Sequence, residues 1–125
     1  IGHTGNMPAT IKAVEIVDEC LGQIVEAVLS LNGFVAITGD HGNAEAKIDP
    51  QTGGVSKEHS ANPVPLIIVA NNLPPTYLQR YHSPMRELST VTPVGVLADI
   101  APTILNLAGL PIPASMTGHD VFQKL

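Results

Sequence analysis

The chain has 125 residues, 44% of them hydrophobic and 14% charged, a composition that excludes intrinsic disorder. Its formal net charge is −5, and no basic run offers a surface for nucleic acid or an anionic membrane. Aromatic residues make up only 3% and there is one cysteine, so the core must be aliphatic and an internal disulfide is excluded.

Residues 8–31 are predicted to form the first helix. Apolar residues recur there at spacings of three and four, which places one apolar stripe on one face. The stripe comprises Val14, Val17, Leu21, Ile24, Val28 and Leu31. Asn6 is expected to cap this helix, and Gly33 is expected to end it.

Two short apolar runs, residues 34–38 and 64–70, are predicted as strands buried on both faces, which is typical of a parallel sheet. Residues 44–62 are interpreted as a loop, and residues 71–93 as an irregular segment with room for an edge hairpin. A second helix is expected over residues 96–107, starting near Asp99 and ending at Gly109. This order predicts an α/β fold, a mostly parallel sheet with helices packed on its faces, and no composition shift divides the chain into two domains.

Asp40 and His41 follow the first predicted strand directly and lie between Gly39 and Gly42. Ligands of open α/β sheets bind outside the carboxyl ends of strands. One carboxylate and one imidazole together suit Zn²⁺ or Mn²⁺ better than Ca²⁺. The competing interpretation, a capping aspartate followed by a surface histidine, explains the dipeptide equally well.

His3 precedes the first helix, and His59 precedes the proline-rich entry into the second strand. Each alone is better explained as an exposed loop histidine. Their combination with Asp40 and His41, all at strand or helix boundaries, favours a metal site near a helix N-terminus that attracts anions. His82 and His119 lack suitable carboxylate neighbours and are interpreted as structural or exposed.

Five motifs, taken in order, resemble the C-terminal part of the phosphatase-like domain of cofactor-independent phosphoglycerate mutases, in the alkaline phosphatase superfamily. The motifs are His3-Thr4-Gly5-Asn6, Asp40-His41-Gly42-Asn43-Ala44-Glu45, His59-Ser60-Ala61-Asn62-Pro63-Val64-Pro65, Ala98-Asp99-Ile100-Ala101-Pro102-Thr103-Ile104-Leu105 and Met116-Thr117-Gly118. The resemblance covers essentially the whole chain. It implies that residues 1–125 are one segment of that domain.

The resemblance further implies two divalent metal ions, manganese first, with magnesium, zinc or cobalt as alternatives. Asp40 and His41 match ligands of the ion that touches a serine nucleophile, and His3 and His59 match ligands of the second ion. The serine takes a phosphoryl group from 3-phosphoglycerate and returns it as 2-phosphoglycerate. This chain contains no catalytic serine of that kind, and Ser56 stands where many members have a further histidine.

We therefore expect a fragment of a cytoplasmic, glycolytic enzyme that is inactive alone. Its expected partners are the phosphoglycerate substrate, the missing N-terminal part of the same polypeptide and further copies of itself, with neither nucleic acid nor a membrane among them. A phosphopentomutase or an alkaline phosphatase-like hydrolase is the alternative within the superfamily. A non-catalytic metal-binding or interaction module is the alternative outside enzymes.

Overall fold

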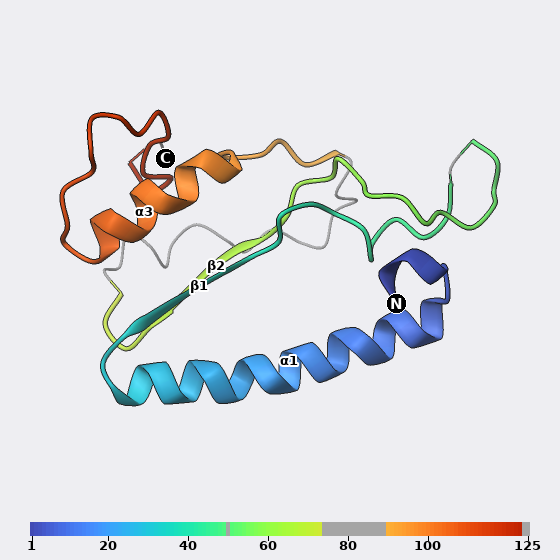
Figure 1. The fold of residues 1–125 in the computed structure, drawn as a ribbon, viewed down its shortest axis with the longest axis horizontal. Helices are drawn as coiled ribbons and strands as arrows, with labels where there is room; N and C mark the ends of the chain where they lie inside the picture. The colour runs from blue at the N-terminus through green and yellow to red at the C-terminus, as the bar shows by residue number, and fades with distance from the viewer. Residues whose placement is uncertain (50, 74–89, 124–125) are drawn as a thin grey trace. The chain divides into compact units, whose positions relative to one another are not determined.

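The computed structural model describes residues 1–49, 51–73 and 90–123. His82 and most of the irregular 71–93 segment, with its expected hairpin, lie outside these residues. The chain divides into two compact units, Ile1–Leu73 and Pro74–Leu125, and each is described by itself. Helices and a sheet are both present, which confirms the α/β class (Figure 1). None of the described helices combines the length and apolar character that a membrane crossing requires.

The first unit begins with a 3-10 turn, η1 (Gly2–Thr4), and the long helix α1 (Met7–Ser30). The Asn6 side chain accepts a hydrogen bond from the Ala9 N–H at 3.1 Å, which confirms the predicted cap. At the other end the expected glycine stop is wrong in detail, because the left-handed residue is Asn32, with φ of 56°. The N–H groups of Asn32 and Gly33 then close the helix on the carbonyls of Leu29 and Val28, both at 3.0 Å.

The predicted apolar stripe of α1 is only partly covered. Leu21 and Val28 are half-buried, whereas the other four members, Val14, Val17, Ile24 and Leu31, are exposed. The helix contacts β1 (Phe34–Thr38), beside which it runs in Figure 1. A helix of 24 residues is about 36 Å long, while a strand of five residues reaches only about 17 Å. The strand is too short to cover the stripe.

β1 pairs with β2 (Leu66–Ala70), as expected, but the pair is antiparallel rather than parallel, with Phe34 opposite Ala70 and Thr38 opposite Leu66. A parallel pair would need a crossover helix between the strands. The described residues between β1 and β2 form no helix and instead continue the hairpin, through antiparallel bridges between Gly42 and Ser60 and between Ile48 and Val55. The end of β1 and the start of β2 therefore lie side by side.

The second unit contains η3 (Leu97–Asp99) and α3 (Ile100–Leu107), within the predicted bounds of the second helix. Asp99 is buried, and its carboxylate accepts the N–H groups of Val96 at 3.0 Å and His119 at 2.8 Å. Thr103 donates its hydroxyl to the Asp99 carbonyl at 2.6 Å. Gly109, with φ of 69°, ends the helix as predicted. Hydrogen bonds of buried aspartate and threonine side chains are therefore more prominent in this unit than the aliphatic core that the composition predicted.

Candidate metal centre

The hairpin brings two of the four predicted ligands together. The bridge between Gly42 and Ser60, with the Ser60 N–H donating to the Gly42 carbonyl at 2.9 Å, places the residues before it, His41 and His59, on opposite arms. Their imidazole rings stack with centroids 3.5 Å apart and planes inclined by 17°. Antiparallel pairing is the physical cause, since it brings the segment that follows β1 alongside the segment that precedes β2.

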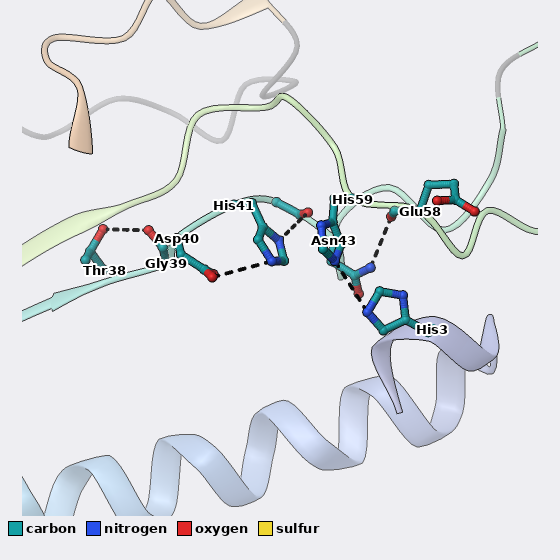
Figure 2. Close-up of polar contacts among 9 residues, drawn as sticks. His3, Thr38, Gly39, Asp40, His41, Asn43, Glu58 and His59 are labelled. Atoms are coloured by element: carbon teal, nitrogen blue, oxygen red, sulfur yellow. Dashed lines mark hydrogen bonds and ion pairs between the residues drawn. The ribbon is translucent and has the colours of Figure 1, made fainter. Parts of the chain in front are cut away.

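His3 reaches the same place from η1, as Figure 2 shows. Its Nδ1 donates to the Lys57 carbonyl oxygen at 2.7 Å, which leaves the lone pair of the imidazole on Nε2. That Nε2 lies 3.4 Å from Nε2 of His59. Anchoring of one ring nitrogen by a carbonyl oxygen is how proteins commonly orient a metal-binding histidine.

The spacing of this pair fits a shared ion. Two nitrogens that bind one tetrahedral ion at about 2.1 Å lie roughly 3.4 Å apart, which matches the separation of the two Nε2 atoms. The donor set, two imidazoles, suits zinc and other late transition metals better than calcium.

Asp40 and His41 make a second, looser pair. Asp40 Oδ2 lies 3.5 Å from His41 Nε2, and 85% of the Asp40 side chain is exposed. His41 Nδ1 lies 3.2 Å from the Gly42 carbonyl oxygen, its hydrogen-bond acceptor. The predicted residues are therefore brought together as two neighbouring pairs, joined by the stacked rings of His41 and His59. No group of three or more His, Cys, Asp or Glu side chains arranged for a metal occurs within the described ranges.

Glu45, which the sequence shows only as part of a motif, joins the two arms of the hairpin through hydrogen bonds. Its Oε2 accepts the Asn43 N–H at 2.8 Å, and its Oε1 accepts the Ser60 hydroxyl and, at 3.1 Å, the Asn62 amide. Burial raises the pKa of Glu45, but the hydrogen bonds from Ser60, Asn43 and Asn62 outweigh it, so the pKa lies below its ordinary value of 4.5.

Lys47 was not anticipated at all. It is buried, and its Nζ donates to the Gly2 carbonyl and, at 2.6 Å, to Asn43 Oδ1. A lone lysine inside a predicted loop offers no sequence signal, because charged loop side chains are normally solvated.

Residues 1–112 match the family model of the Metalloenzyme superfamily. Proteins named 2,3-bisphosphoglycerate-independent phosphoglycerate mutase are similar over almost the whole chain. The one from Thermomicrobium roseum is 48% identical over 97% of this chain, and those from Herpetosiphon aurantiacus and Clostridioides difficile are 49% and 44% identical over 98% and 99%. The chain spans only about a fifth of their length, 21% to 22%.

A solved structure shows the same likeness. Leishmania mexicana phosphoglycerate mutase, crystallised at low cobalt concentration, aligns with a TM-score of 0.70 and 34% identity. The alignment covers 96% of this chain and 22% of the Leishmania chain. In fold as in sequence, the likeness thus covers almost all of this chain but only about a fifth of the longer proteins.

Proposed function

Because the chain belongs to the Metalloenzyme superfamily, we propose that residues 1–125 are the C-terminal segment of the metal-binding, phosphatase-like domain of a phosphoglycerate mutase. The intact enzyme interconverts 3-phosphoglycerate and 2-phosphoglycerate through a phosphoserine. The names of the similar proteins and the share of their length that this chain spans support the proposal.

In this proposal His3 and His59 hold one divalent ion and Asp40 and His41 hold another, with manganese as the ion. The observation that carries it is the 3.4 Å separation of the two Nε2 atoms, with the His3 ring oriented by the Lys57 carbonyl. When bound, such ions neutralise charge on a phosphoryl group and lower the pKa of a coordinated hydroxyl. The chain's own contribution is to hold two imidazole nitrogens, Nε2 of His3 and Nε2 of His59, at a spacing that suits one ion.

The phosphoryl-accepting serine comes from the rest of the polypeptide. Ser60, the serine beside His59, donates its hydroxyl to Glu45, so it is engaged in holding the hairpin. Without an accepting hydroxyl, covalent phosphoryl transfer has no first step. The segment therefore contributes metal ligands, while its partners are the preceding part of the same chain and the phosphoglycerate. A cytoplasmic location belongs to the same proposal, as the compartment of glycolysis.

Substitution in the full-length polypeptide tests the assignment. We expect His59→Ala and Asp40→Ala to lower kcat by about a hundredfold or more and to change KM far less, because the ions act mainly on the transition state. His119→Ala, an exposed histidine in the second unit, is the matched control and should leave kcat unchanged. Wild-type turnover in His59→Ala or Asp40→Ala would remove that residue from the active site.

The 125-residue chain gives a second test. With Mn²⁺ and 3-phosphoglycerate it should show no turnover above background, because the serine is missing. Its Mn²⁺ affinity, measured by calorimetric titration, should be weak, since each proposed ion has only two protein ligands here. Nanomolar Mn²⁺ affinity would instead identify a metal-storage module.

A further inference from the structure

We propose that Lys47 and Asn43 are positioning residues that set the spacing of the His3 and His59 pair. The proposal rests on the proposed function only in that the pair is taken to receive a metal ion. The positioning itself concerns the metal-free chain and is visible in its hydrogen bonds.

The first part of this hydrogen-bonded link between the two histidines is the buried amine of Lys47. Only 4% of the residue is exposed, and within the described residues no carboxylate lies within ion-pair distance of its Nζ. The amine donates to the carbonyl of Gly2, which belongs to the peptide group directly before His3, and to Asn43 Oδ1. Burying an ammonium group without a carboxylate is unfavourable. Those two hydrogen bonds are what offset that cost.

Asn43 provides the second part of the hydrogen-bonded link. Its Nδ2 donates to the Glu58 carbonyl at 3.1 Å, which belongs to the peptide group directly before His59. Three hydrogen bonds through two side chains therefore join the peptide groups that precede the two histidines. Gly2 makes room for this arrangement, because a Cβ at Gly2 would lie 2.4 Å from Asn43 Oδ1.

The geometry explains why the two Nε2 atoms face each other. The Lys57 carbonyl fixes the rotation of the His3 ring, but it does not fix the η1 backbone that carries it. Lys47 ties that backbone to Asn43, and Asn43 ties the arm that carries His59. A positive charge near a cation site also repels the ion, so charge alone predicts that removing the amine would tighten metal binding. Positioning predicts the opposite.

The test compares Lys47→Met with Lys12→Met in the 125-residue chain. Methionine keeps an unbranched side chain that suits a buried site, while Lys12 is an exposed α1 lysine whose loss removes the same charge. In Lys47→Met we expect the proton NMR cross-peaks between the His3 and His59 rings to disappear and Co²⁺ affinity to fall about tenfold. The thermal unfolding midpoint should stay the same or rise, since an unpaired buried charge is removed. Lys12→Met should retain the cross-peaks and the affinity.

A second variant, Asn43→Asp, breaks only the bond to Glu58, because a carboxylate still accepts from Lys47. It should lose the same cross-peaks, and it decides the question if Lys47→Met fails to fold. Preserved ring contacts in either folded variant, or tighter Co²⁺ binding in Lys47→Met, would overturn the proposal. If the wild-type chain shows the ring contact but no Co²⁺ binding that depends on the histidines, the metal assignment is rejected. The cross-peaks would still decide whether Lys47 and Asn43 position the two rings.

Discussion

Glu45 is the side chain on which the meeting of the two hairpin arms depends. Its hydrogen bonds to Asn43, Ser60 and Asn62 hold its pKa below 4.5, so the carboxylate is better stabilised in the folded chain than in the unfolded one. A depressed pKa contributes stability that is fully present above the ordinary value and is lost as pH falls through the lowered one. We expect the Asn43 amide resonance, followed by ¹⁵N NMR, to shift with a midpoint below 4.5.

Glu45→Gln is the control for that titration, since a carboxamide of the same size has no such midpoint. The variant should also show a weaker hairpin at neutral pH, because its amide group cannot accept the Asn43 N–H and the Ser60 hydroxyl together. A wild-type midpoint at or above 4.5 would mean that burial outweighs the hydrogen bonds.

The candidate ligands could be predicted from the sequence because each lies where an element begins or ends. His3 comes before α1, Asp40 and His41 come after β1, and His59 comes before the prolines that precede β2. The positioning residues could not be predicted in this way. Lys47 acquires its role only when the hairpin buries it, and nothing in the residues around it distinguishes a buried lysine from a solvated one.

At the scale of elements, the helix and strand bounds followed from local patterns, but the direction of the strand pair did not. A short, mostly apolar run fits a parallel or an antiparallel neighbour equally well. The direction was decided by the segment between the strands, whose described residues, 39–49 and 51–65, fold back as a hairpin instead of forming a crossover helix. Pro63 and Pro65 also delay the start of β2 to Leu66, since proline has no N–H for the ladder.

The end of α1 provides a test at this scale. Asn32 holds the left-handed conformation that closes the helix, and a residue with a plain Cβ pays about 1 kcal/mol or more there. Asn32→Ala should therefore lower the free energy of unfolding by about 1 kcal/mol in urea titrations followed by circular dichroism. Asn32→Gly, which adopts this conformation freely, should be neutral or stabilising. Equal stability of the two variants would show that the helix ends in another way in solution.

At the scale of the molecule, the described residues leave much apolar surface uncovered. Among the described residues, the only buried apolar side chains larger than alanine are those of Val121 and Pro102. Apolar residues of α1 and β2 are exposed in the first unit, including Val17, Ile24 and Ile67. Large exposed apolar patches mark surfaces that another element or chain covers. In the proposed full-length enzyme that role falls to the preceding part of the polypeptide.

The 125-residue chain alone should therefore self-associate. β1 and β2 form a sheet of two strands, so within the described residues each strand has one edge without a partner strand, beside exposed aliphatic side chains. Such an edge is a template for pairing with another copy, and a composition with 14% charged residues offers little repulsion against it. Static light scattering over a concentration series should show an average mass that rises above the monomer value.

A charge placed at this surface should reverse the effect. Ile67 is 48% exposed on β2, and Ile67→Lys adds a charge of the kind that natural edge strands use against pairing. We expect it to lower the average mass toward the monomer. Gln23→Lys, which adds the same charge at an exposed polar position of α1, should not. A wild-type chain that stays a monodisperse monomer at high concentration would refute self-association. Equal effects of the two lysines would point to net charge rather than to the β2 surface.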